Sequence, residues 1–136
     1  MGLMFFDGQP INEVEAFIKE HYKGGTVIDF GCGAGRYVEM FPADMYTGVD
    51  GHEDNIIACK ARWPERKFLV RDLETWKPKK KYDYLFSSVV FDQLENLPKD
   101  WAKTYILIED KKYEEEFKPE ISEVLFDNVR MMICNS

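Results

Sequence analysis

The stretch Val27-Ile-Asp-Phe-Gly-Cys-Gly-Ala-Gly-Arg36 decides the fold of this chain. Its apolar start predicts a short buried strand, and its glycines predict a tight turn that leads into a helix. Glycine has no side chain, so such a turn lets a ligand approach the backbone closely. Asp29 is followed by glycines at alternate positions, Gly31, Gly33 and Gly35. A dinucleotide-binding fingerprint would place its third glycine one residue later, so the turn predicts a different ligand.

The residues after the turn predict a helix and a second strand that lies parallel to the first. Residues 36–41 predict a helix that ends before Pro42, and residues 45–49 predict a second strand that leads into Asp50. A strand–helix–strand unit of this length forms a right-handed parallel crossover. The carboxyl ends of both strands then lie at the same edge of the sheet, where open α/β folds bind ligands. We therefore expect Asp50 at a ligand-binding edge.

The rest of the chain predicts further strands and helices. We expect helices over residues 7–22, 36–41, 52–63, 91–97 and 111–118, and strands over residues 26–30, 45–49, 67–70, 82–86, 103–108, 121–126 and 129–134. Asp127-Asn128 predicts a tight hairpin between the last two strands, because both residue types tolerate positive φ. The expected fold is α/β, with a doubly wound, mostly parallel sheet of about seven strands, the last antiparallel, and helices on both faces.

Two of these helices have a predicted buried side. Residues 7–22 place Ile11, Val14, Phe17, Ile18 and His21 on one stripe. Residues 52–63 are expected to turn Ile56, Ile57 and Ala61 inward.

Composition limits the classes of function. The chain has 136 residues and a net charge of −7, which suits one domain and argues against broad binding of nucleic acid through phosphate contacts. No apolar run approaches the length of a membrane span. The cysteines at positions 32, 59 and 134 are odd in number and far apart, so we expect no disulfide framework and a cytoplasmic location.

The glycine turn resembles motif I of the class I S-adenosylmethionine-dependent methyltransferases. In that family the turn lies against the nucleoside and methionine part of the cofactor, and the acid at the position of Asp29 helps to hold the amino-acid tail. Thr47-Gly-Val-Asp-Gly51 resembles the motif in which an acid, here Asp50, accepts both ribose hydroxyls. His52 then lies beside the adenine or the ribose, or else it caps the next helix.

Two further segments resemble motifs of the same family. In Arg71-Asp72-Leu73-Glu74, the resemblance implies that Asp72 accepts from the adenine N6 amine and that the backbone of Leu73 reaches N1; the alternative is an exposed acidic turn. The segment Lys81–Val90 resembles the fourth-strand motif, whose end, at Ser87 and Ser88, lies beside the cofactor.

The resemblance implies a Rossmann-like fold, a single methyltransferase domain over residues 1–136 and S-adenosyl-L-methionine as the cofactor. The expected cofactor-binding residues are Asp29, Gly31, Cys32, Gly33, Gly35, Asp50, Gly51, His52, Asp72, Leu73 and Ser87. The predicted function is methyl transfer to an unidentified small-molecule acceptor. Two alternatives remain: a non-catalytic cofactor-binding module, and a subunit whose substrate site a protein partner completes.

Other residues are expected to take no part in the chemistry. The fourth strand lacks the Asn/Asp-Pro-Pro-aromatic and Pro-Cys turns of enzymes that methylate bases. Asp92, Glu109 and Tyr113 are expected at the surface, and no catalytic residue is assigned. Glu109 and Asp110 would form only half of a magnesium site, so none is expected. Phe5 and Phe6 could close over the cofactor, and the basic run Lys77–Lys81 is expected in solvent.

Overall fold

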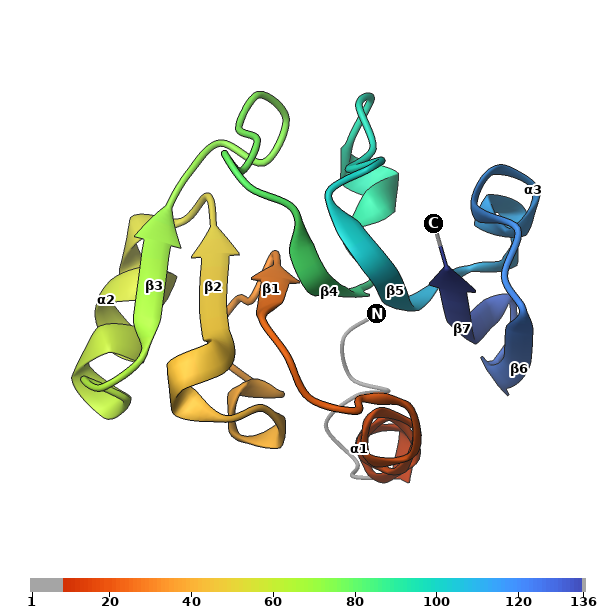
Figure 1. Cartoon of the computed structure of the whole chain (residues 1–136), viewed down its shortest axis with the longest axis horizontal. Helices are drawn as coiled ribbons and strands as arrows, with labels where there is room; N and C mark the ends of the chain where they lie inside the picture. The colour runs from red at the N-terminus through yellow and green to blue at the C-terminus, as the bar shows by residue number, and fades with distance from the viewer. Residues whose placement is uncertain (1–8, 136) are drawn as a thin grey trace.

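A computed structural model describes residues 9–135, and Figure 1 shows their sheet and helices. The strands are β1 (Val27–Phe30), β2 (Tyr46–Asp50), β3 (Lys67–Val70), β4 (Tyr82–Ser88), β5 (Ala102–Asp110), β6 (Ile121–Phe126) and β7 (Val129–Asn135). The α-helices are α1 (Gln9–His21), α2 (Glu53–Arg62) and α3 (Glu114–Phe117). Short 3-10 helices are η2 (Val38–Met40), η3 (Ala43–Met45), η4 (Phe91–Gln93) and η5 (Lys111–Tyr113).

The seven strands form one sheet in the order β3-β2-β1-β4-β5-β7-β6. The strands from β3 to β5 pair in parallel, and β7 is antiparallel to both β5 and β6. The last two strands are joined at Asp127, whose φ is +47°. The doubly wound, mostly parallel sheet with an antiparallel last strand is therefore confirmed.

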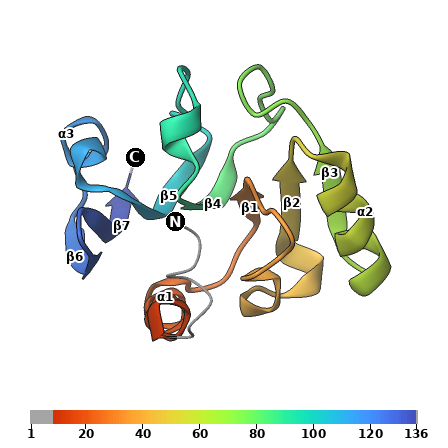
Figure 2. The ribbon, with the colours of Figure 1, turned by 180° about the vertical axis from the view of Figure 1, so that it is seen from behind.

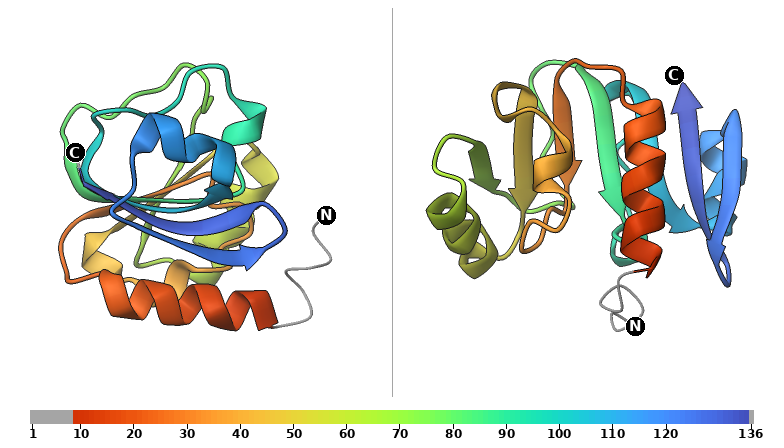
Figure 3. Two further views of the ribbon diagram at one scale, coloured as in Figure 1. Left: turned by 90° about the vertical axis from the view of Figure 1, so that its right-hand side faces the viewer. Right: turned by 90° about the horizontal axis from the view of Figure 1, so that it is seen from below.

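Alternation along the strands divides the core between the two faces of the sheet. Tyr84 and Phe86 lie on the face covered by α1 and α2, whereas Leu85 lies on the other face. α1 buries Val14, Phe17 and Ile18, as its spacing predicts. Figure 3 shows α1 on one side of the sheet and α3 on the other. In Figure 2 the loops on either side of β4 lie away from α1.

Three predicted helices are wrong in form. Residues 36–41 contain only η2, residues 91–97 contain only η4, and residues 111–118 divide into η5 and the single turn α3. Turns occupy residues 33–37, and Gly35, with φ +93°, packs so closely on Trp63 that a Cβ would lie 2.5 Å from the indole ring. Only six residues then remain before Pro42, too few for a regular helix of ordinary length.

The predicted inner side of α2 is partly wrong. Ile56 is buried, but Ile57 is 58% exposed and Ala61 is exposed. Cys59 fills the inward position instead, because it lies three residues after Ile56 on the same side of the helix.

Candidate functional site

The glycine turn after β1 packs against two neighbouring segments. The backbone N–H groups of Gly31 and Cys32 both donate to the carbonyl of Val49, at 2.8 and 3.0 Å. A Cβ on Gly31, whose φ is +80°, would lie 2.6 Å from a methyl of Val90. Gly33, with φ +57°, has no atom within 4 Å of the place where its Cβ would be. The turn is therefore held to β2 on one side and to residue 90 on the other.

Asp50 joins this turn to the start of α2. One of its carboxylate oxygens accepts from the N–H of Gly33 at 3.2 Å. The other accepts from the N–H of His52 at 3.0 Å and from the side-chain amide of Asn55 at 3.1 Å. A carboxylate accepts about four hydrogen bonds, so bidentate acceptance of a ribose diol would require one of these donors to move. The ribose role of Asp50 stays a prediction.

A cavity of about 400 Å³ opens beside the glycine turn, at the carboxyl edge of the sheet. Its volume is within the range of small-molecule sites. One wall carries most of the predicted cofactor-binding residues: Gly31, Gly33, Asp50, Gly51, His52, Asp72 and Leu73. The other wall consists of Glu74, Ser88, Val89, Val90, Gln93 and Leu94. Segments from both halves of the chain thus enclose one space.

Four predicted residues do not line this cavity: Asp29, Cys32, Gly35 and Ser87. Asp29 is 4% exposed and accepts from the hydroxyl of Tyr46 at 2.5 Å. Burial raises its pKa to about 7, although the bond from Tyr46 acts in the opposite direction. Cys32 is buried, and its thiol lies 3.8 Å from the carbonyl of Gly33. The cofactor-binding roles of all four residues stay predictions.

The two residues with open alternatives, His52 and Asp72, both lie at the mouth of the cavity. The side chain of His52 is 81% exposed, 3.4 Å from the Asp50 carboxylate. His52 occupies the N-cap position of α2, but its side chain makes no capping hydrogen bond. Asp72 is exposed, and its carboxylate accepts from the N–H of Glu74 at 2.9 Å. The His52 side chain and Asp72 are therefore both exposed where they line the cavity.

Glu74 was not assigned a role from the sequence, yet it connects two loops at the cavity. Its carboxylate accepts from the N–H of Glu95 at 2.9 Å, and from the N–H and side-chain amide of Asn96 at 2.7 and 2.8 Å. These bonds lower its pKa. The partners of Glu74 lie about twenty residues further along the chain. The only sign of this contact in the sequence is therefore the acidic character of residues 72–74.

The predicted surface position of Glu109 is wrong. Glu109 is 2% exposed, and its carboxylate accepts from the hydroxyl of Ser87 at 2.6 Å and from the N–H groups of Val90 and Phe91 at 2.9 and 3.2 Å. Burial raises its pKa to about 7, although these hydrogen bonds act in the opposite direction. Glu109 therefore holds, from the core, the backbone of the segment that forms the second wall of the cavity. This segment includes Val89, whose φ is +55°.

Asp92 and Tyr113 lie on the outer side of the same wall. Asp92 is exposed and Tyr113 is half-buried. The Tyr113 hydroxyl donates to Asp92 at 2.7 Å, and the Lys112 ammonium lies 2.9 Å from the same oxygen. η4 is thus fixed both from the core and from the surface. Phe5 and Phe6, for which the sequence leaves open either ordinary packing or closure over the cofactor, lie outside the described residues.

None of the helices within residues 9–135 is long and apolar enough to cross a membrane.

Comparison with known proteins assigns this chain to a family. The family model described as "Methyltransferase domain" matches residues 27–106, more than half of the 136 residues. The chain is 37% identical over 73 residues to trans-aconitate 2-methyltransferase of Rhizobium rhizogenes, covering 51% of this chain and 28% of that protein. It is 30% identical over 87 residues to malonyl-[acyl-carrier protein] O-methyltransferase 2 of Ilyobacter polytropus, covering 59% and 34%.

A solved structure agrees with the fold. The crystal structure of TehB from Haemophilus influenzae superimposes with a TM-score of 0.70 at 15% identity, covering 92% of this chain and 62% of that chain. The matched region spans about a third of the length of each of these two curated relatives. The resemblance of the glycine turn to a methyltransferase motif is confirmed: the chain belongs to the methyltransferase domain family and has a Rossmann-like fold.

Proposed function

We propose that this domain transfers the methyl group of S-adenosylmethionine to a small molecule that enters the cavity between the glycine turn and residues 88–94. The observation that carries the proposal is the cavity itself, which brings the glycine turn, Asp50 and Asp72 to one edge of the sheet. S-adenosylmethionine supplies an electrophilic methyl on a cationic sulfur. The carboxylates of Asp50, Asp72 and Glu74 would complement that positive charge.

We further infer that the acceptor arrives already ionised, as a carboxylate does at neutral pH. A general base is needed only when the nucleophile arrives protonated. The residues of the second wall beyond Glu74 are Ser88, Val89, Val90, Gln93 and Leu94, and none of them titrates near neutral pH. Transfer would then depend on positioning rather than on proton abstraction. The two curated relatives are named for trans-aconitate and a malonyl group, both of which contain carboxyl groups.

Two measurements test the proposal. Calorimetric titration with S-adenosylhomocysteine and, separately, with NADH should give binding of the first alone. Incubation with methyl-labelled cofactor should transfer label to members of a panel of small di- and tricarboxylates, in a product that alkali hydrolyses as it does an ester. Binding of NADH in place of S-adenosylhomocysteine would refute the cofactor assignment. Tight binding without transfer to any acceptor would support the alternative of a non-catalytic module or a subunit that needs a protein partner.

We also propose that residues 1–136 act as a single domain and that the protein resides in the cytoplasm. The cavity is built from segments on both sides of β4, which supports one folding unit. Cys32, Cys59 and Cys134 are buried free thiols, which suits a reducing compartment.

A further inference from the structure

The crossover from β3 to β4, residues 71–81, leaves part of the sheet without a helix over it. In the sheet order, β2 and β1 lie between these two strands, so the connection must pass over both. Doubly wound folds normally cover this face with a crossover helix. The described residues 71–81 contain turns and no helix.

The length of the connection explains why it is extended. Three strand spacings amount to about 14 Å, and the return along a four-residue strand adds about 13 Å at right angles, so the path is about 20 Å long. A helix of eleven residues would reach only about 16 Å, whereas an extended chain of that length reaches about 36 Å. The crossover therefore has no residues to spare for a helix that covers the sheet.

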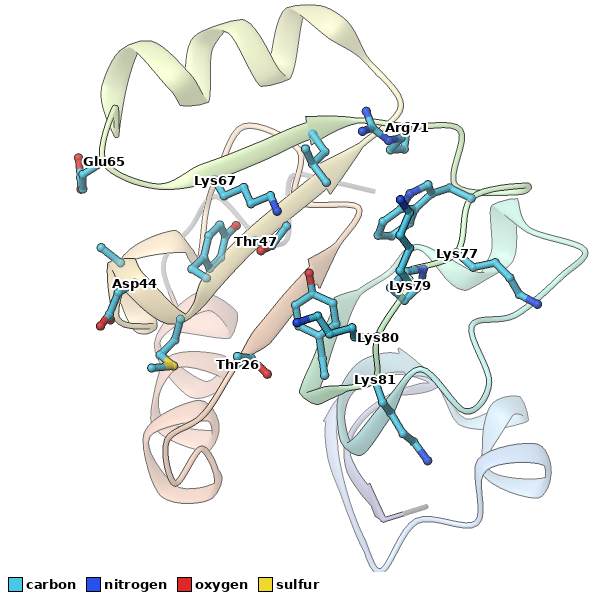
Figure 4. A pocket seen from close by; sticks show the side chains of 17 residues that line it. Thr26, Asp44, Thr47, Glu65, Lys67, Arg71, Lys77, Lys79, Lys80 and Lys81 are labelled. Atoms are coloured by element: carbon cyan, nitrogen blue, oxygen red, sulfur yellow. The ribbon is translucent and has the colours of Figure 1, made fainter.

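A hollow of about 760 Å³ lies under this crossover, and Figure 4 shows its side chains. Thr47 and Leu69 come from the open faces of β2 and β3, and Trp76 and Tyr82 come from the crossover and the start of β4. Leu69, Trp76 and Tyr82 are all half-buried. Thr26, which precedes β1, also lines it, so the hollow lies toward the amino ends of the strands, at the opposite edge from the cofactor cavity.

The rim of the hollow is basic in a protein whose net charge is −7. Six cationic side chains line it, against two acidic ones, Asp44 and Glu65: the cations are Lys67, Arg71, Lys77, Lys79, Lys80 and Lys81. The four lysines of the run are exposed, as the sequence predicts. None of the four makes an ion pair with another described residue. Their charge is therefore available to a partner.

The cations form a ridge and do not converge on one point. Figure 4 shows Lys67 and Lys80 lying over the hollow, whereas Lys77 and Lys81 point away from it. The same lysines line a second hollow of about 380 Å³, with Lys99 and Trp101 on its other side. A ligand that uses all of this charge must extend along the crossover.

We propose that the basic ridge (Lys77, Lys79, Lys80 and Lys81) and the hollow beside it form a docking site for an acidic, amphipathic helix of a partner protein. Its apolar side would cover Leu69 and Trp76, in the place where a crossover helix covers the sheet in other doubly wound folds. Its carboxylates would pair with the ridge. This inference goes beyond methyl transfer, because it concerns the opposite edge of the sheet.

The charge pattern favours a protein helix over a nucleic acid or a small anion. Figure 4 shows Asp44 and Glu65 across the hollow from the lysine run. A chain with a phosphate at every nucleotide would meet these carboxylates, whereas a peptide can place its charges on one side. A small anion would require convergent donors, which the spread lysines do not provide.

The test uses a fluorescent peptide of about 18 residues with glutamates and leucines on opposite sides of a helix, long enough to form one. Its anisotropy should report binding to the protein with a Kd below about 100 μM, weakened as NaCl rises from about 0.05 M to about 0.3 M. Lys79→Glu with Lys80→Glu should weaken binding at least about tenfold by turning two attractions into repulsions. Leu69→Ser should weaken it without changing the salt dependence.

The matched control is Lys19→Glu with Lys60→Glu, which changes the net charge by the same four units (two for each substitution) on α1 and α2, away from the hollow. It should change the peptide's Kd by less than about twofold, since surface charges beyond a Debye length are screened. Every variant should keep the wild-type affinity for S-adenosylhomocysteine, which checks the fold. The proposal is overturned by any of four results: no binding of the peptide, equal binding of a scrambled peptide, an equal loss in the control variant, or tighter binding of a single-stranded RNA of about 20 nucleotides.

Discussion

Two carboxyl groups, on Asp29 and Glu109, are 4% and 2% exposed in the interior of the sheet. Burial raises the pKa of each to about 7, against hydrogen bonds from Tyr46 and Ser87 that act in the opposite direction. In an unfolded chain the same groups titrate near pH 4. The folded state therefore binds their protons more tightly than the unfolded state does, which links stability to pH.

The sign of the linkage predicts that the domain loses stability as pH rises. Below about pH 4 both carboxyls are protonated in the folded and the unfolded state, and their full contribution to the free energy of unfolding is present. Between about pH 4 and pH 7 only the unfolded state releases these protons, which lowers the free energy of unfolding by on the order of 3 kcal/mol for each group. The thermal midpoint without cofactor should decrease as the pH is raised from 5 to 8. Asp29→Asn and Glu109→Gln should each flatten that fall.

A matched control for the pH experiment is Asp92→Asn. Hydrogen bonds from Tyr113 and Lys112 lower the pKa of Asp92, so its titration is complete below pH 5 and the slope above that pH should be unchanged. A wild-type midpoint that stays constant or rises between pH 5 and pH 8 would show that neither buried carboxyl keeps its proton in the folded state.

At the scale of single residues, the sequence predicted where a residue lies in the fold better than it predicted the hydrogen-bond partners of that residue. Asp50 and Asp72 were predicted at the ligand-binding edge, because the carboxyl ends of parallel strands meet there, and both line the cavity. Glu109 lies near the carboxyl end of β5, but the sequence gives no sign that Ser87 and the N–H groups of residues 90 and 91 enclose it. Such contacts arise between segments that are remote in sequence, so local patterns do not contain them.

At the scale of elements, the glycine turn and the segment 88–91 are predicted to stabilise each other. Gly31→Ala would place a methyl 2.6 Å from Val90 at φ +80°, so it should cost about 1–2 kcal/mol for the backbone and about 1–3 kcal/mol more for the overlap. Gly33→Ala, at φ +57° with open space around it, should cost the backbone part alone. Urea unfolding of both variants without cofactor measures the difference.

A second substitution separates the overlap from the backbone strain. Val90→Ala in the Gly31→Ala background should recover most of the additional loss, because it removes the methyl that the new Cβ meets. Equal destabilisation by Gly31→Ala and Gly33→Ala would instead mean that the segment 88–91 yields to the new methyl at no cost, and that it is not a fixed wall of the cavity.

Strands were predictable and short helices were not. Each predicted strand is present, because an apolar run bounded by turn residues gives a strand whether its neighbours are near or far. The helices expected over 36–41 and 91–97 became 3-10 turns, because one or two turns of helix depend on packing more than on sequence preference. The absence of a helix in 71–81 follows from the distance between β3 and β4, which becomes known only with the strand order.

At the scale of the whole molecule, the cavity beside the glycine turn joins the two halves of the sheet. Its first wall comes from residues between β1 and α2 and from residues 72 and 73 after β3, and its second wall comes from Glu74 and from residues 88–94 at the end of β4 and in the turn after it. Asp50, Glu74 and Glu109 each hold a part of these walls through hydrogen bonds between segments distant in sequence. A ligand that fills the cavity therefore contacts both halves at once.

This arrangement predicts that S-adenosylhomocysteine stabilises the domain as one unit. At a concentration one hundred times its Kd, a ligand that binds only the folded state adds about 2.7 kcal/mol to the free energy of unfolding, which for a chain of this size raises the thermal midpoint by about 10 °C. Calorimetry should show one transition with and without the ligand. Hydrogen exchange should slow both in residues 31–35 and in residues 88–94, because each group lies in a wall of the same cavity. Two separate transitions, or slower exchange in residues 31–35 alone, would mean that the ligand is held by the glycine turn only and that the segment 88–94 is free to move while the cofactor is bound.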